Sequence, residues 1–189
     1  MNRQHDRLKM MLVTALFAAI IGILAQVTIP LPLVPITGQT LAVGLAATIL
    51  GSRYGTLSAF LYMLLGAVGL PVFASMSGGM GVIVGPTGGY IVSFIFSAFV
   101  IGYYLEKTSF TIPQAFIANI IGMFVNLAIG TVWLKYLAEL SWTGAFASGF
   151  LPFIIGGIIK ALLAAWVGII VRQRLISAKL LKTSEKISA

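Results

Sequence analysis

Long apolar stretches, separated by short groups of polar, glycine and proline residues, run along almost the whole chain. Six of them are long enough to cross, or nearly cross, a bilayer core of about 30 Å. These stretches are approximately residues 8–27, 37–50, 54–68, 90–104, 112–140 and 150–171. The second and third are short and flank stretches rich in glycine and proline, which indicates broken or partly re-entrant helices around a protein cavity. The pattern predicts an all-α integral membrane protein with six transmembrane helices.

Composition supports this fold. The 189 residues are 59% hydrophobic and 8% charged, with a mean hydropathy of +1.06, whereas about a quarter of the residues in a soluble domain are charged. Cysteine is absent, so disulfides and thiolate metal sites are excluded. The single histidine, His5, lies in the polar N-terminal segment, where we expect a solvated side chain. We therefore expect one membrane domain, residues 1–189, that ends in a basic tail, residues 172–189.

The net charge of +8 is distributed as the positive-inside rule requires. Eight of the twelve Lys and Arg residues are near the termini: Arg3, Arg7, Lys9, Arg172, Arg174, Lys179, Lys182 and Lys186. With Arg53 and Lys107, ten of the twelve lie inside if both termini are cytoplasmic, and the outer loops 28–36, 69–89 and 141–149 are then uncharged. This distribution predicts a multi-pass plasma-membrane protein rather than one that binds nucleic acid.

The segment GGMGVIVGPTGGY, residues 78–90, contains six glycines but no lysine or arginine. It therefore lacks the lysine of a P-loop, and its glycine spacing does not fit the dinucleotide-binding pattern. Its PTGGY ending is only weakly similar to a potassium-channel filter. Because an apolar, uncharged loop of this length is unusual, we interpret it as a lid over a pocket, with an ordinary external loop as the alternative.

The first outer loop has a similar character. In VTIPLPLVPITGQT, residues 27–40, three prolines hold the chain extended and prevent a helix. Thr37 is placed to cap the following helix, and Gln39 offers both donor and acceptor groups. A purely structural role and a ligand contact both fit these residues.

Lys160 lies about ten residues into the sixth apolar stretch. A lysine at the bilayer centre costs about 2.5–3.5 kcal/mol on insertion scales, so we expect it to face a cavity and to have a partner. The acidic residues all lie near predicted helix ends: Asp6, Glu106, Glu139 and Glu185. An anionic or carbonyl-bearing ligand would supply the missing partner. Snorkelling of the side chain to the outer surface is the alternative.

Small and amide residues mark two further helices. Asn119 and Asn126 are seven residues apart on one face of the fifth stretch, where they fit either interhelical hydrogen bonds or a polar ligand. Ala15, Ala19 and Gly22 give the first helix a smooth face for another helix, either internal or from another subunit. The apolar stretches contain no Ser/His/Asp set, carboxylate pair or metal-ligand cluster, so we do not expect an enzyme.

Four segments together carry a family resemblance: PLPLVPITGQTLAV (30–43), GLPVFASMSGG (69–79), GPTGGY (85–90) and GGIIKALLAAW (156–166). They resemble the BioY family, the biotin-specific S-components of energy-coupling factor (ECF) transporters, and look similar to BioY of lactic acid bacteria. The resemblance covers nearly the whole chain. It implies six transmembrane helices and an outward-facing biotin pocket under the first and third outer loops.

The resemblance also implies partners. A high-affinity biotin-binding subunit of this kind works with a transmembrane coupling subunit and two cytoplasmic ATPases. In the S-component pattern an A-x-x-x-A motif on the first helix docks the coupling subunit, and here Ala15 and Ala19 match it, with Gly22 on the same small-residue pattern. An S-component for another vitamin, or a self-contained channel or facilitator, is the alternative function.

The residues that we expect around biotin follow from this resemblance and from side-chain chemistry. Lys160 would bind either the valerate carboxylate or the ureido oxygen. The remaining expected binding residues are Asn126, Gln39, Thr37, Tyr90, Phe73, Gly85, Thr87, Gly157 and Trp142. The chain departs from the family's P-G-D-x-x-K pattern, because Ile155, Gly156 and Gly157 precede Lys160, so the lysine is present and the acid is not.

Overall fold

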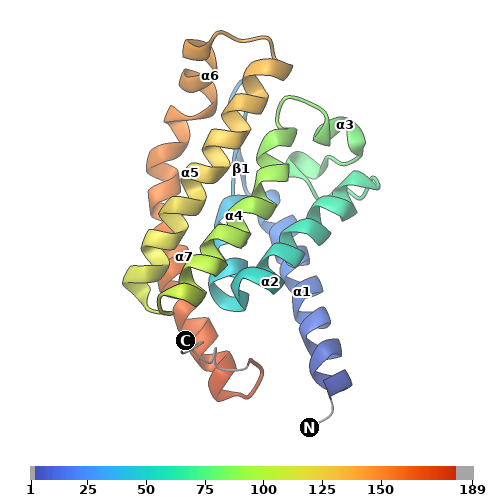
Figure 1. Cartoon of the computed structure of the whole chain (residues 1–189). Helices are drawn as coiled ribbons and strands as arrows, with labels where there is room; N and C mark the ends of the chain where they lie inside the picture. Colours follow the sequence, from blue (N-terminus) through green and yellow to red (C-terminus); the bar gives the residue numbers. More distant parts are fainter. Residues whose placement is uncertain (1–2, 182–189) are drawn as a thin grey trace.

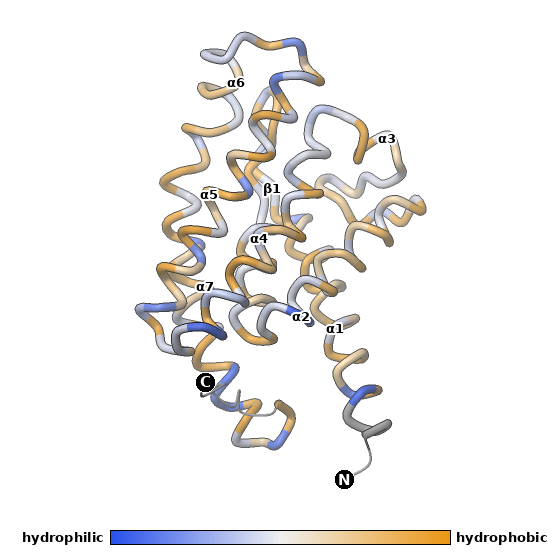
Figure 2. Tube along the Cα trace, in the orientation of Figure 1, coloured by the Kyte–Doolittle hydropathy of each residue, from blue (hydrophilic) through white to orange (hydrophobic). Residues whose placement is uncertain are grey.

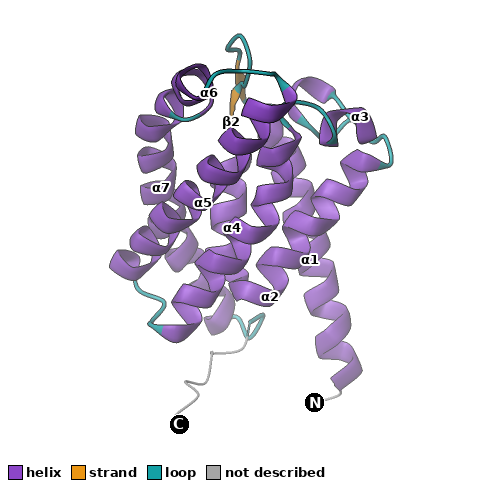
Figure 3. Cartoon of the chain, turned by 45° about the horizontal axis from the view of Figure 1, so that its top comes forward, coloured by secondary structure: helices purple, strands orange, loops and turns teal. Residues whose placement is uncertain are grey.

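The computed structural model describes residues 3–181, which form a bundle of helices (Figure 1). The long helices are α1 (Arg3–Ala25), α2 (Gln39–Ala67), α4 (Gly88–Lys107), α5 (Ile112–Leu137) and α7 (Leu151–Ser177). The shorter elements are β1 (Thr28–Ile29), β2 (Ile36–Thr37), a 3₁₀ turn at Ala74–Met76, α3 (Met80–Ile83) and α6 (Trp142–Gly149). The strands, α3 and α6 gather at one end of the bundle, here called the hairpin end (Figure 3). Helix α1 begins and α7 ends at the opposite, terminal end.

The all-α membrane fold is confirmed. Within residues 3–181, four helical segments are long and apolar enough to cross a bilayer: Arg7–Ala25, Gly88–Lys107, Ile112–Leu137 and Trp142–Ser177. Hydrophobic residues dominate these helices along their length (Figure 2). The remaining apolar helix, α2, is bent into two arms that both run along the bundle.

The bend in α2 lies at Gly51, whose φ of 82° and ψ of −174° leave helical geometry. The predicted short segments 37–50 and 54–68 correspond to the two arms, which pack so closely that a Cβ on Gly55 would lie 2.7 Å from Ala47 Cα. Glu106 accepts hydrogen bonds of 2.7 Å from both the amide and the hydroxyl of Ser52, at the start of the second arm. A carboxylate at this position satisfies free helix-terminal N–H groups.

Arg172 stabilises the other side of the bend. The prediction that it lies in a cytoplasmic tail was therefore wrong. Its side chain is only 6% exposed, and Nη1 donates a hydrogen bond to the carbonyl of Ile49 at the end of the first arm. The guanidinium carbon also lies 3.6 Å from the centroid of the Phe110 ring. Helix α7 continues to Ser177, so the tail begins later than residue 172. Lys182, Glu185 and Lys186 are outside the described residues.

Two other predicted boundaries were wrong. Helix α5 ends at Leu137 rather than at residue 140, and Glu139 takes a left-handed conformation with φ of 53°. The expected third outer loop, 141–149, is mostly the helix α6. This helix begins where Ser141 Oγ accepts a hydrogen bond from the Gly144 amide at 3.1 Å, a standard N-cap.

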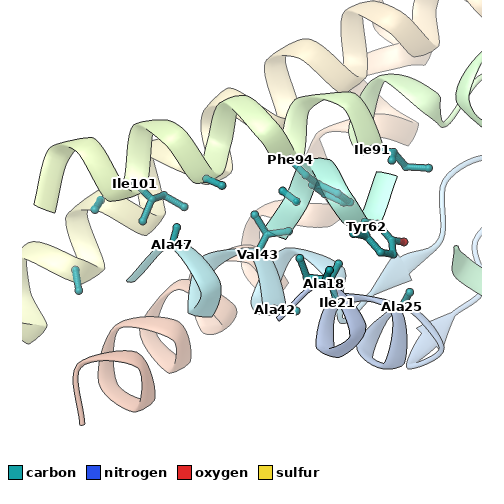
Figure 4. Packing of buried hydrophobic residues seen from close by; sticks show 14 of the residues in the cluster. Ala18, Ile21, Ala25, Ala42, Val43, Ala47, Tyr62, Ile91, Phe94 and Ile101 are labelled. Carbon is teal, nitrogen blue, oxygen red and sulfur yellow. The ribbon is translucent and has the colours of Figure 1, made fainter. Parts of the chain in front are cut away.

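The main buried core lies where α1, α2 and α4 meet (Figure 4). Its members include small residues on α1 and α2 and larger ones on α4, among them Ala18, Ala42, Ala47, Phe94 and Ile101. Small residues let helix backbones approach closely, and this close van der Waals packing holds helices together in a membrane.

We predict that Gly51→Ala lowers the stability of the purified protein by about 1–3 kcal/mol, because only glycine readily adopts this backbone conformation. The new Cβ would also collide with Glu106 Oε1. Thermal unfolding in detergent, followed by tryptophan fluorescence, measures the effect. Gly81→Ala is the matched control, since a Cβ there meets nothing within 4 Å. Equal melting temperatures for the two variants would contradict the assignment of the bend.

Candidate functional site

A cavity of about 250 Å³ lies at the hairpin end of the bundle. Its walls come from the first loop (Val34, Pro35), the second loop (Phe73, Ser75, Ser77) and the adjoining ends of α2, α4, α5 and α7. A smaller cavity of about 60 Å³ continues toward the terminal end between the same helices. The two share Thr40, Phe94, Asn126, Phe153 and Lys160, so they form one continuous site.

The covering loops differ from the expected pair. Residues of the first loop and of the second, 69–89, line the larger cavity, whereas no residue of 141–149 lines either cavity. The expectation of a pocket under the first and third outer loops is therefore wrong for the third loop. Its chain folds into α6 instead and packs on α5 and α7.

Lys160 is the only charged residue among the described residues that line these cavities. Its half-buried side chain extends from α7, and Nζ donates hydrogen bonds to the Thr37 carbonyl at 2.7 Å and to Thr40 Oγ1 at 3.2 Å. Both acceptors are neutral, so the positive charge is solvated by dipoles rather than cancelled by a carboxylate. A site of this kind favours an anionic or strongly polar ligand group.

Thr37 and Gln39 form a buried network with Tyr62. Thr37 Oγ1 donates to Gln39 Oε1 at 2.7 Å, and Gln39 Nε2 donates to the Tyr62 hydroxyl. The network fixes the orientation of the Gln39 amide, since its oxygen and one N–H are already paired. Thr37 and Gln39 both line the larger cavity.

Asn126 and Tyr90 lie side by side across α4 and α5. Asn126 Nδ2 donates to the Tyr90 carbonyl at 3.1 Å and to Ser93 Oγ at 2.6 Å. These two bonds fix the orientation of the Asn126 amide. Its oxygen accepts no hydrogen bond from the described residues. The Tyr90 hydroxyl donates to the Gly149 carbonyl at 2.7 Å, while its ring stacks on Phe153 with centroids 6.2 Å apart.

The other expected residues divide into two groups. Phe73 and Thr87 line the larger cavity, and Gly157 lines the smaller one, where Met123 Sδ fills the space in front of it. Gly85 and Trp142 line neither cavity. The Gly85 carbonyl accepts a hydrogen bond from Trp133 Nε1 at 3.0 Å. Trp142 is 53% exposed and packs edge-on against Tyr136 at the end of α5.

Sequence reasoning missed several lining residues, notably Thr40, Phe94 and Phe153. Phe153 precedes Lys160 by seven residues and therefore lies on the same helical face, a spacing that could have revealed it. Thr40 ends the first-loop segment 27–40, and nothing in that segment predicted it as a partner of Lys160. Within residues 3–181 no group of three His, Asp or Glu side chains is placed to hold a metal ion.

The three residues of α1 that were predicted to dock a partner do not all lie on the exposed face of the helix. Ala15 and Ala19 are exposed on its outer face, next to exposed Leu12 and Leu16. Gly22 is buried, and a Cβ there would lie 3.4 Å from Val72 Cβ. Gly22 is therefore part of the internal packing and does not belong to the exposed face.

The family model described as "BioY family" matches residues 1–177. The chain belongs to the BioY family. It is 42% identical over 166 residues to the biotin transporter BioY2 of Lactococcus lactis subsp. cremoris, which covers 88% of this chain and 91% of that protein. It is 39% identical to the biotin transporter BioY of Thermotoga maritima over 86% of this chain and 95% of that one.

A solved structure agrees with this assignment to the BioY family. The chain superposes with a TM-score of 0.82 and 30% identity on the crystal structure of the S-component for biotin from an ECF-type ABC transporter. The match covers 92% of this chain and 95% of that one. The family and the S-component fold expected from the sequence are thus confirmed.

Tyr90→Phe should destabilise the protein by about 1 kcal/mol, because the Gly149 carbonyl loses its shortest hydrogen bond. The carbonyl keeps a weaker bond from Thr131 Oγ1 at 3.2 Å, which limits the loss. Thermal unfolding measures it, with Tyr136→Phe as the control because that ring is 63% exposed. If both variants melt at the wild-type temperature, the Tyr90 hydroxyl is not a structural tie between α4 and α6.

Proposed function

We propose that this chain is the biotin-binding S-component of an ECF-type ABC transporter. The proposal is supported by membership of the BioY family and by relatives that are named as biotin transporters. The observation that supports it most directly is the cavity at the hairpin end, which is lined by one lysine and by amide and hydroxyl groups held in fixed orientations.

Biotin matches the chemistry of this cavity. Its valerate carboxylate is anionic, its ureido ring offers two N–H donors and one carbonyl acceptor, and its thiophane ring is apolar. Lys160 supplies a positive charge, and the Asn126 oxygen, which accepts no hydrogen bond from residues 3–181, supplies an acceptor. Phe73, Phe94 and Phe153 supply apolar walls. A cationic vitamin such as thiamine fits less well, because Lys160 would repel it.

The absence of an acid at position 157 shapes how the ureido ring is held. Met123 Sδ occupies the space beside Gly157, so a thioether stands where a carboxylate acceptor would be expected in the family. The ureido N–H groups must then find neutral acceptors. Asn126 Oδ1 and the hydroxyl groups of Thr37 and Thr40 are available in the same cavity.

We orient the protein with both termini in the cytoplasm and the hairpin end outside. Arg53, Lys107 and Arg174 lie near the terminal end, as the positive-inside rule requires. The cavity then receives biotin at the outer face of the plasma membrane. Delivery inward requires a transmembrane coupling subunit and two cytoplasmic ATPases, and the exposed face at Ala15 and Ala19 of α1 would dock the coupling subunit.

Lys160→Met should weaken biotin binding more than tenfold, which corresponds to about 1.4 kcal/mol or more. Calorimetry on the purified protein measures this, with Lys135→Met as the control, since Lys135 lies over the rings of Tyr136 and Trp142 instead of in the cavity. Unchanged affinity in Lys160→Met would remove this residue from the site.

Biotin methyl ester identifies the ligand group that Lys160 contacts. If Lys160 binds the carboxylate, the ester binds wild type and Lys160→Met almost equally, because the charge that the lysine recognises is gone. If Lys160 binds the ureido oxygen, the variant loses affinity for the ester and for biotin by the same factor.

Ala19→Trp should reduce association with the coupling subunit while leaving biotin affinity unchanged, because a large ring prevents close helix approach at an exposed position. Co-purification of the complex measures association, and calorimetry on the isolated chain measures affinity. The control is Ile117→Trp, on the exposed surface of α5. Normal assembly of Ala19→Trp would exclude this face as the docking surface.

A further inference from the structure

A groove of about 510 Å³ lies at the terminal end of the bundle, between residues 8–17 of α1 and residues 175–181, which are the end of α7 and the turn after it. It is here called the terminal groove. It shares no lining residue with the ligand cavity at the hairpin end. Both of its walls project beyond the ends of α4 and α5 (Figure 1). Lys9 is its one polar lining residue among residues 3–181.

The α1 wall follows from the spacing of its side chains. Residues four positions apart lie on one helical face, so α1 presents two neighbouring rows to the groove. These rows are Leu8, Leu12 and Leu16, and Lys9, Val13 and Phe17. From residue 8 to residue 17 the helix rises about 14 Å. The hydrocarbon of one bilayer leaflet is about 15 Å thick, so the groove is long enough to follow a lipid chain through one leaflet.

The opposite wall is made by the chain turning back after α7. The amides of Leu180 and Leu181 both donate to the Leu175 carbonyl, at 2.8 and 3.2 Å, and Lys179 takes a left-handed conformation with φ of 57°. Leu181 joins a buried cluster that also contains residues of α1. Lys9 Nζ donates to the Lys179 carbonyl at 2.7 Å. This bond connects the two walls and fixes the shape of the groove.

Basic side chains gather on both walls at the terminal end, where hydrophilic positions interrupt the apolar helices (Figure 2). They are Arg7, Lys9, Arg174 and Lys179. Within residues 7–181 the acidic residues are Glu106, which accepts hydrogen bonds from Ser52, and Glu139, which follows α5. Neither acid belongs to α1 or α7. The apolar groove therefore has a cationic rim that requires an anionic partner.

An anionic phospholipid has the chemistry of this groove. In the orientation proposed above, the rim lies at the cytoplasmic membrane surface and the apolar rows run into the hydrocarbon. Basic pockets between transmembrane helices on the cytoplasmic side bind anionic lipid headgroups. A helix from a protein partner would fit the apolar rows, but the four cations at the rim favour the lipid. Lys9 keeps two N–H donors for a phosphate after its bond to Lys179.

We propose that the terminal groove binds one anionic phospholipid of the cytoplasmic leaflet. One acyl chain lies along the row that begins at Leu8, and the phosphate lies between Lys9 and Lys179. Arg7 and Arg174 add positive charge at the rim. The end of the groove at Leu16 adjoins the exposed Ala15 and Ala19. This inference goes beyond the proposed function, because it holds whatever ligand fills the cavity at the hairpin end.

Native mass spectrometry of the purified chain in detergent tests the site by titration with phosphatidylglycerol or with phosphatidylcholine of the same acyl chains. Wild type should bind one phosphatidylglycerol at least about tenfold more tightly than phosphatidylcholine, which carries no net charge. Lys9→Gln/Lys179→Gln should lose this preference. Equal affinities of wild type for the two lipids would overturn the proposal.

Two control variants isolate the charge of the groove. Arg53→Gln/Lys107→Gln removes two cations from the same end of the bundle, where each lies beside an aromatic ring outside the groove, and should keep the preference. Lys9→Arg/Lys179→Arg keeps both charges and should also keep it, which separates charge from the bond between the two walls. Equal losses in the two glutamine variants would show general surface attraction and overturn the site.

Leu12→Trp tests the apolar part of the groove without changing charge. The indole ring would occupy the row that holds the acyl chain, so phosphatidylglycerol should bind at least about tenfold more weakly. Ile117→Trp is the control, since Ile117 lies on α5 and is exposed to a comparable extent. Wild-type lipid affinity in Leu12→Trp would overturn the proposal, and reduced co-purification with the coupling subunit in that case would assign the groove to a protein partner instead.

Discussion

The organisation of the site depends on placing the Lys160 ammonium group inside an apolar bundle. A charge in this setting must be solvated by the protein, and Lys160 is solvated by the Thr37 carbonyl and the Thr40 hydroxyl. These bonds connect α7 to β2 and to the start of α2. They hold the first-loop hairpin above the cavity, and they leave the positive charge without an anionic partner in the described structure.

The two ends of the bundle use their polar groups differently. At the terminal end, Arg172 and Glu106 satisfy backbone groups on either side of the α2 bend and stabilise a rigid base. At the hairpin end, the Asn126 oxygen accepts no hydrogen bond from the described residues, and Lys160 Nζ bonds only to the Thr37 carbonyl and the Thr40 hydroxyl among them. A fixed base below a cavity with unpaired polar groups suits a subunit that captures a substrate.

Sequence patterns predicted the fold well because hydrophobic length is a strong constraint in a bilayer. The place of Lys160 followed from the cost of an intramembrane charge. Arg172 was placed wrongly because a basic residue near the end of a hydrophobic stretch usually begins a cytoplasmic tail. The residues around it in the sequence do not indicate that it bonds to a carbonyl on a distant helix. Trp142 fits an interfacial position as well as a ligand contact. Gln26 hydrogen-bonds to residues 46–50 positions further along the chain, and sequence spacing gives no sign of these contacts.

The isolated chain should capture biotin in a cavity preformed by its own helices, without a coupling subunit or ATPases. Isothermal titration of the purified chain in detergent with biotin, with thiamine as the cationic comparison, tests this most directly. We expect one saturable biotin site per chain, filled at micromolar or lower concentration, and no comparable heat with thiamine. Absence of biotin binding at micromolar concentration would contradict it.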